Sequence, residues 1–155
     1  MGRGITILIQ WAIVGVYVLA MFLFAGQDAS SAGYTSSLLA RWLPHLSAAE
    51  LRQLVFLARK AVHVVAYAVL TLIVYLAARR TKGLRRVALP FAGGFAFIVA
   101  MADEKYQSRL LHRTGTVNDV LIDALGIGVT VLGLWVMIRI KRQNKEVVED
   151  VEDKR

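Results

Sequence analysis

The chain contains no cysteine, which excludes disulfide bonds, thiolate nucleophiles and cysteine-ligated zinc. It also lacks a G-x-S-x-G nucleophile elbow, an H-E-x-x-H zinc motif and a glycine-rich phosphate loop. Charged residues are few, at 19% of 155 residues, whereas 57% of the residues are hydrophobic. The mean hydropathy is +0.54. In so short a chain, this apolar excess indicates a membrane protein rather than a large soluble core.

Four largely apolar segments are candidates to cross a membrane whose hydrocarbon core is about 30 Å thick. They are residues 5–24, 55–78, 87–102 and 117–138. We therefore expect an all-α integral membrane bundle of four transmembrane helices, formed by residues 1–138 and followed by a charged cytoplasmic tail at residues 139–155. The first segment is longer than the apolar core of a signal peptide and has no clean cleavage site, so we expect it to remain as a span.

The distribution of basic residues predicts the orientation of these spans. The loop at residues 79–86 holds five lysines and arginines and no acid, and the tail from residue 139 holds six. With Arg3, these segments share one side of a four-span bundle, and the positive-inside rule makes that side cytoplasmic. The net charge of +8 is thus a topology signal, and we expect no nucleic-acid partner. The mixed-charge segment after Lys145 is expected to be frayed or disordered.

The connection at residues 25–54 is expected to lie outside the cytoplasm and to be partly helical. Leucines and a tryptophan at residues 38–43 follow helical spacing, and Pro44 ends that segment. The sequence SAAE at residues 47–50 is a capping box. We therefore expect a helix that begins near Ala48 and continues into the second span.

Ionisable residues inside three of the spans fall at a similar depth. Polar residues within a membrane are costly and usually face a bundle interior or a cavity. A rise of 1.5 Å per residue puts His63, Asp103 and Asp123 roughly 6 to 12 Å below the extracytoplasmic boundary. We therefore expect these helices to share one polar site. The residues expected there are Lys60, His63, Asp103, Glu104, Arg113, Asp119 and Asp123.

The spacing within each helix agrees with a shared site. Lys60, His63 and Tyr67 lie on one face of the second span. The other two helices carry stripes of small and polar residues, which permit close helix approach in lipid. The stripe on the fourth span is Asp119, Asp123, Gly126, Thr130 and Gly133, and that on the third is Ala96, Ala100, Asp103 and Gln107.

Asp103 and Glu104 come near the expected end of the third span, where the helix macrodipole disfavours carboxylates. Either this helix continues to about residue 111, or Lys60 and Arg113 neutralise the two carboxylates. We expect Arg113 to pair with a carboxylate from the third or fourth helix.

Several of these residues also have a purely structural interpretation. Arg59 and Lys60 can extend along the helix to the membrane interface. His63 can be a hydrogen-bonded packing residue rather than a metal ligand or a base. Asp119 can cap the fourth helix through a capping box that begins at Thr116.

Two stretches carry recognisable motifs. MADEKYQSRLLHRTGTVNDVLIDALG carries a D-E-x-x-Q run, an R-x-G loop and a helix that opens with Asp, and KAVHVVAYAVL carries K-x-x-H-x-x-x-Y. Together these motifs resemble the signature of the VanZ-like family of membrane proteins. The segment at residues 27–31 resembles the family's outer loop more loosely, and the resemblance covers about residues 25–133. Asp123 stands where the family usually has Asn, and Leu111-His112 where a proline is common. The matching positions are Lys60, His63, Tyr67, Asp103, Glu104, Gln107, Arg113, Gly115, Asp119 and Gly126.

The family is named for teicoplanin resistance in glycopeptide-resistance clusters. The resemblance therefore implies a multi-pass protein of the bacterial plasma membrane with a role in the cell envelope. It does not by itself establish an enzyme.

Two classes of function fit these residues. In the class that we favour, a pocket open to the outer leaflet binds a membrane lipid headgroup or a lipid-linked wall precursor, with donors from Lys60, His63 and Arg113. In the other, a hydrolase or transferase acts on a lipid phosphate, and a serine nucleophile would come from Ser30 or Ser31. A transporter is a third alternative and would require an oligomer.

The same residues serve both main hypotheses. The expected ligand-binding residues are Lys60, His63, Tyr67, Asp103, Glu104, Gln107, Arg113, Asp119 and Asp123. The candidate catalytic residues are His63, Asp103, Glu104 and Asp123, which could act as general acids and bases or ligate a hard divalent cation. The sequence assigns no metal-ligand set, no cofactor and no oligomeric state.

Overall fold

The computed structural model describes residues 2–27, 30–110 and 117–153. Within these residues the chain forms five α-helices and a short 3-10 turn, η2 (Arg85–Val87). The helices are α1 (Gly2–Ala25), α2 (Ala32–Trp42), α3 (Ala48–Ala78), α4 (Ala88–Gln107) and α5 (Val117–Asp153). Four of them, α1, α3, α4 and α5, contain a segment long and apolar enough to cross a membrane. The predicted all-α class with four candidate spans is therefore confirmed.

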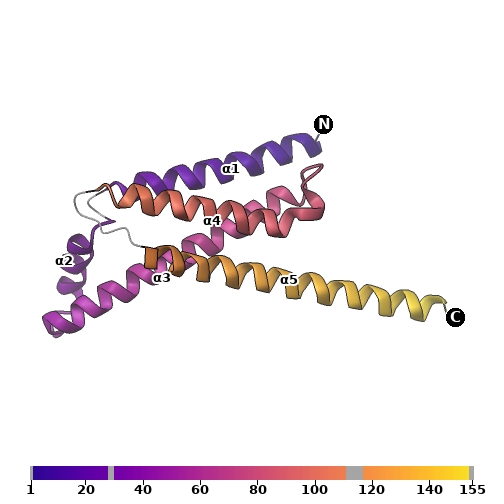
Figure 1. Ribbon diagram of the computed structural model, residues 1–155. Coiled ribbons are helices and arrows are strands. Elements are labelled where there is room, and N and C mark those ends of the chain that lie inside the picture. The colour runs from indigo at the N-terminus through magenta and orange to yellow at the C-terminus, as the bar shows by residue number, and fades with distance from the viewer. Residues whose placement is uncertain (1, 28–29, 111–116, 154–155) are drawn as a thin grey trace.

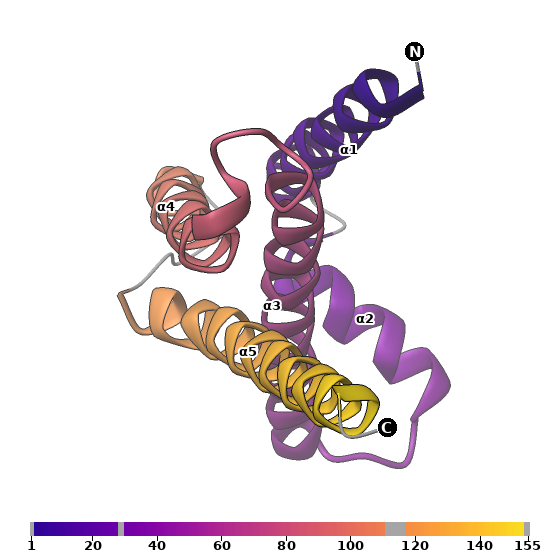
Figure 2. The ribbon, with the colours of Figure 1, turned by 90° about the vertical axis from the view of Figure 1, so that its right-hand side faces the viewer.

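Helix α3 is the centre of the arrangement and contacts each of the other four α-helices. Figure 1 shows the N-terminal end of α1, the connection between α3 and α4, and the far end of α5 at one end of the molecule. Helix α2 and the first turns of α3 lie at the other end. The view in Figure 2 shows α4 and α5 beside α3, with α1 and α2 packed elsewhere around it. The basic connection and both terminal helix ends thus share one end, as four spans require.

The ends of α2 and α3 follow the capping signals in the sequence. The side chain of Ser31 accepts a hydrogen bond of 3.1 Å from the backbone N–H of Tyr34 and so caps α2. At the start of α3, the Ser47 N–H donates to the Glu50 carboxylate at 2.8 Å, and the Glu50 N–H donates to Ser47 Oγ at 3.3 Å. The capping box and the helix start at Ala48 are as predicted.

Small residues bring α4 close to α3. Ala92, Ala96 and Ala100 recur every four residues on α4 and are fully buried. Leu70 and Val74 of α3 belong to the same buried cluster. The hydrophobic effect contributes little to helix association in lipid, because the surrounding chains are also apolar. Close packing of small side chains is therefore a main source of stability for the contact between α3 and α4. The face predicted for the third span therefore points into the bundle. Asp103 and Gln107, both buried, lie on this face near the C-terminal end of α4.

The stripe of small residues on α5 packs against α3 as predicted over its first part. A Cβ atom added to Gly126 would lie only 2.1 Å from the carbonyl oxygen of Val64, so the two backbones touch. One turn further, Thr130 Oγ1 donates to the carbonyl oxygen of Ala68 at 3.3 Å. Gly133 does not continue this contact, because it is exposed and has nothing within 4 Å of its Cβ position. Toward its C-terminal end, α5 diverges from the bundle (Figure 1).

The structure rules out one alternative for the third span and corrects one expectation for the tail. Helix α4 ends at Gln107, so the alternative in which it continues to about residue 111 does not hold. Helix α5 continues to Asp153, where a frayed or disordered end after Lys145 was expected. The segment at residues 139–153 contains no glycine or proline, and Lys145 and Glu149 form an ion pair of 3.3 Å at helical spacing. Both features stabilise an exposed helix, which explains the difference.

Candidate functional site

Polar residues of α3, α4 and α5 gather near the end of the molecule that carries α2. The structure describes eight of the predicted ligand-binding residues: Lys60, His63, Tyr67, Asp103, Glu104, Gln107, Asp119 and Asp123. Each of the eight contacts another residue of this set or lines a cavity beside it. Arg113 and Gly115 lie outside the described residues, so the pairing expected for Arg113 remains a prediction.

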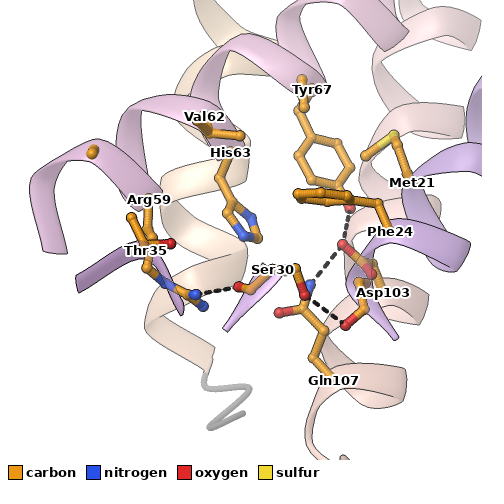
Figure 3. Close-up of a pocket in the computed structure, with 13 residues that line it drawn as sticks. Met21, Phe24, Ser30, Thr35, Arg59, Val62, His63, Tyr67, Asp103 and Gln107 are labelled. Carbon is orange, nitrogen blue, oxygen red and sulfur yellow. Dashed lines mark hydrogen bonds between the residues drawn. The ribbon is translucent and has the colours of Figure 1, made fainter. Parts of the chain in front are cut away.

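Asp103 is held by two buried donors. The Tyr67 hydroxyl donates to Asp103 Oδ2 at 3.0 Å, and the Gln107 side-chain amide donates to the same oxygen at 2.9 Å. Figure 3 shows these three side chains joined across the α3–α4 contact. Asp103 is 3% exposed, and its other oxygen, Oδ1, has no hydrogen-bond partner among the described residues. The carboxylate is therefore fixed in position with one oxygen still able to take a partner.

His63 and Asp123 form a second pair, between α3 and α5. His63 Nδ1 lies 2.9 Å from Asp123 Oδ1, and Asp123 is fully buried. If Nδ1 carries the proton, Nε2 is free to accept a proton or bind a metal, since the two nitrogens of a neutral imidazole have opposite roles. Asp123 Oδ2 has no hydrogen-bond partner in the described part of the chain. A carboxylate-oriented imidazole of this kind suits a general base or a metal ligand.

Lys60 pairs with Asp119, which lies on the first turn of α5. The sequence had offered Lys60 and Arg113 as the cations that neutralise Asp103 and Glu104. Lys60 instead joins α3 to α5 through its ion pair, and Arg113 lies outside the described residues. The capping box proposed from Thr116 also begins outside them.

Two cavities meet at this cluster and differ in character. The first, of about 180 Å³, has mainly apolar walls and ends at Asp103 and Gln107 (Figure 3). The second, of about 490 Å³, is lined largely by polar and charged side chains. The apolar walls of the first include Met21, Phe24, Ala58, Val62 and Ala66, and the charged lining of the second is Arg52, Arg59, Lys60, Glu104 and Asp119. Arg59, His63 and Gln107 line both cavities, so they mark the place where the two meet.

Sequence reasoning missed Arg52 and Arg59 as site residues. The sequence suggests that Arg59 extends to the interface, yet it lines both cavities and its guanidinium donates to the backbone oxygen of Ser30. The spacing of residues along α3 could have indicated the role of the two arginines. Arg52, Phe56, Arg59 and His63 recur at intervals of four, three and four residues, which is one face of α3.

The two serines considered as nucleophiles contact backbone atoms. Ser30 Oγ donates to the carbonyl oxygens of Gln27, at 2.6 Å, and Ala25, at 3.2 Å. Ser31 Oγ accepts from Tyr34 as the cap of α2. Among the described contacts, the Ser30 hydroxyl thus binds backbone oxygens, and the Ser31 hydroxyl caps α2.

Comparison with known proteins supports the motif interpretation. Curated proteins and solved structures gave no match. The profile of the VanZ/LLP1 family matches residues 8–139, which include every residue of the site described above. The match agrees with the resemblance found in the K-x-x-H-x-x-x-Y and D-E-x-x-Q motifs. With four helices long and apolar enough to span a bilayer, the chain is a membrane protein that belongs to the VanZ/LLP1 family.

Proposed function

We propose that this protein binds an anionic lipid at the extracytoplasmic face of the bacterial plasma membrane. The ligand is either the headgroup of a membrane lipid or a lipid-linked cell-wall precursor. The observation that carries the proposal is the meeting of an apolar cavity with a charged, arginine-containing one at Arg59, His63 and Gln107. A molecule with a hydrocarbon chain and a phosphate fits such a pair of cavities.

The two arginines of the charged cavity support recognition of a phosphate. Arg52 and Arg59 both line it, and a guanidinium can bind two phosphate oxygens at once. The volume of about 490 Å³ falls within the range of ordinary ligand pockets. Lys60 lines the same cavity, although its ammonium is paired with Asp119. The arginines therefore supply the main attraction for an anion.

The apolar cavity supports recognition of a hydrocarbon chain. Met21 and Phe24 contribute from α1, and Val62 contributes from α3. These side chains lie within apolar helices that are candidate membrane spans, so a lipid chain reaches the cavity without leaving the bilayer.

The location of the site supports the extracytoplasmic face. The basic connection at residues 79–86 lies at the opposite end of the molecule from α2 (Figure 1). By the positive-inside rule the basic end is cytoplasmic, which puts the cavities near the outer leaflet. Binding of a wall precursor there would connect the protein to glycopeptide action, including the teicoplanin resistance for which the family is named.

The test is a lipid-binding measurement on the purified protein in detergent micelles, with a polyprenyl monophosphate, phosphatidylglycerol and phosphatidylcholine as probes. We expect both anionic lipids to bind more tightly than phosphatidylcholine. Arg59→Gln should weaken anionic binding at least about tenfold, which corresponds to 1.4 kcal/mol. The matched control is Arg41→Gln, because Arg41 is exposed on α2 and lines neither cavity.

The outcomes separate the alternatives. Preference for the polyprenyl monophosphate supports a wall precursor, and preference for phosphatidylglycerol supports a membrane lipid. Equal binding of all three lipids, or equal losses in Arg59→Gln and Arg41→Gln, would overturn the proposal.

A membrane-embedded enzyme that acts on a lipid phosphate is the second candidate. The observation that favours it is the contact of 2.9 Å between His63 and Asp123 at the wall of the same cavities. This pair can supply a general base next to a bound phosphate. Release of inorganic phosphate from the polyprenyl monophosphate, lost in His63→Gln while binding is retained, would select this alternative.

A further inference from the structure

We propose that His63, Glu104 and Asp123 form the binding site of one divalent transition-metal ion such as Zn²⁺. These residues come from α3, α4 and α5, and each can offer one ligand atom within 4.8 Å of the other two. The three helices therefore converge on one point. From the sequence, a hard divalent cation bound through oxygens was one interpretation of the acidic residues and His63, and no ligand set was assigned.

Burial gives an independent indication of a cation at this point. Asp123 is fully buried, and its Oδ2 has no hydrogen-bond partner among the described residues. A buried carboxylate oxygen without a partner costs free energy, and a bound cation removes that cost. Glu104 is only 5% exposed, so the carboxylates that converge here are shielded from solvent that would otherwise compete for the ion.

The types of ligand favour a metal ion of intermediate softness, such as Zn²⁺. Carboxylates alone suit Mg²⁺ and Ca²⁺, whereas an imidazole in the set favours Zn²⁺ and its neighbours in the first transition series. One histidine and two carboxylates make three protein ligands, which leaves a fourth position for water or for a phosphate oxygen, as in catalytic zinc sites.

The geometry requires only a small adjustment. Ligand atoms around tetrahedral zinc lie roughly 3.4 Å apart, so atoms now within 4.8 Å must approach by about 1 Å. Small side-chain rotations supply such a shift. Because His63 Nδ1 already contacts Asp123 Oδ1 at 2.9 Å, His63 Nε2 and Asp123 Oδ2 are the atoms that remain to bind the ion.

The neighbouring carboxylates have different roles. Asp119 is paired with Lys60, which sets it apart from the three ligands. Asp103 is oriented by Tyr67 and Gln107, and its remaining oxygen can accept a hydrogen bond from a metal-bound water.

This inference deepens the proposed function, since an ion beside the shared wall of the two cavities would contact the phosphate of a bound lipid. Such an ion polarises a phosphoryl oxygen and lowers the pKa of a bound water. Ion binding itself does not depend on the lipid. The two proposals can therefore fail separately.

The experiment measures Zn²⁺ binding to the 155-residue chain in detergent, after removal of metal with a chelator and without added lipid. We expect one Zn²⁺ per chain by equilibrium dialysis and elemental analysis. Asp123→Asn and Glu104→Gln should each lower the affinity at least tenfold, whereas Glu146→Gln, at an exposed position of α5 that lines neither cavity of the site, should leave it within about twofold. Co²⁺ gives a second readout, because its visible spectrum reports the ligand set and should change in His63→Gln.

A variant with an altered buried carboxylate can fail to fold, so thermal melting provides a further test. Zn²⁺ should raise the melting midpoint of the wild type, because a ligand that binds only the folded state stabilises it. The half-buried His63 tolerates replacement better, and His63→Gln should remove this shift. Absence of stoichiometric Zn²⁺ binding by the wild type, or equal binding by His63→Gln, would overturn the metal site. Zn²⁺ binding without any lipid preference would instead leave the metal site standing and overturn the proposed function.

Discussion

Gly126 touches the backbone of Val64, and this contact sets the distance between His63 and Asp123. Val64 follows His63 on α3, and Gly126 lies one turn after Asp123 on α5. A Cβ atom at Gly126 would meet Val64 O at 2.1 Å, so a side chain larger than hydrogen would push the helices apart. The contact of 2.9 Å between His63 and Asp123 lies one turn away on the same helix pair. The glycine is therefore part of the site although it carries no functional group.

Gly126→Ala should accordingly disrupt both stability and the site. Because the clash is with backbone, α3 and α5 must separate, and overpacking of this kind costs about 1–3 kcal/mol. We expect a lower melting midpoint in detergent and weaker binding of Zn²⁺ and of the polyprenyl monophosphate. Gly128→Ala is the matched control, since Gly128 is exposed on the same helix with nothing within 4 Å of its Cβ position. Equal behaviour of the two variants would contradict this prediction.

Tyr67→Phe should loosen Asp103 without changing the shape of the core. The substitution removes the hydroxyl that donates to Asp103 Oδ2, and Gln107 remains as the donor. Loss of one buried hydrogen bond to a charged group costs about 1.5–3 kcal/mol. We expect a lower unfolding free energy in detergent, together with weaker lipid binding. Tyr34→Phe, at an exposed position on α2, should change neither property.

Helical periodicity predicted which residues face inward. The face that carries His63 and Tyr67 and the face that carries Asp103 and Gln107 both follow from a repeat of 3.6 residues. The start of α3 at Ala48 followed from a capping box whose two hydrogen bonds are local. That His63, Asp103 and Asp123 lie at one level of the bundle also followed from the sequence, because each helical residue adds a fixed rise. Each of these features is determined by the sequence of a single helix.

The partners of the polar residues could not be predicted in the same way. Lys60 pairs with Asp119 because α3 and α5 approach closely near Gly126, and the rotation of one helix against another depends on such contacts. Arg59 was missed as a site residue for the same reason, since its importance comes from the packing of the segment before α2 against α3. The helical end of α5 was missed because mixed charge was taken to indicate disorder, whereas its residues also suit a helix.

The orientation in the membrane gives a further prediction. Reporter domains fused after Arg80 and after Arg155 should both report the cytoplasm. The reason is that five basic residues at 79–86 share one end of the molecule with the far end of α5 (Figure 1). A reporter fused after Trp42, at the end of α2, should report the opposite side. Signals from the same side for Arg80 and Trp42 fusions would disprove the topology.

The last prediction concerns His63 and Asp103, which line one cavity from different helices. His63→Ala and Asp103→Asn should each abolish function while the protein still inserts and is expressed, because each removes a group that faces the shared cavity. The double variant should be no worse than either single variant, since groups that act as a unit are not additive. Val65→Leu is the control, because Val65 is exposed on the outer face of α3.

Asp103→Asn also separates the two functional classes. The amide keeps the shape of the side chain and can still pair with Tyr67, but it cannot serve as a base. If the site is catalytic, this variant should bind the polyprenyl monophosphate as tightly as the wild type and lose phosphate release, which lowers the turnover number and leaves lipid affinity unchanged. If the site only binds a headgroup, affinity and cellular phenotype should fall together. Full function in both single variants, with Val65→Leu also unaffected, would show that His63 and Asp103 do not serve a common site.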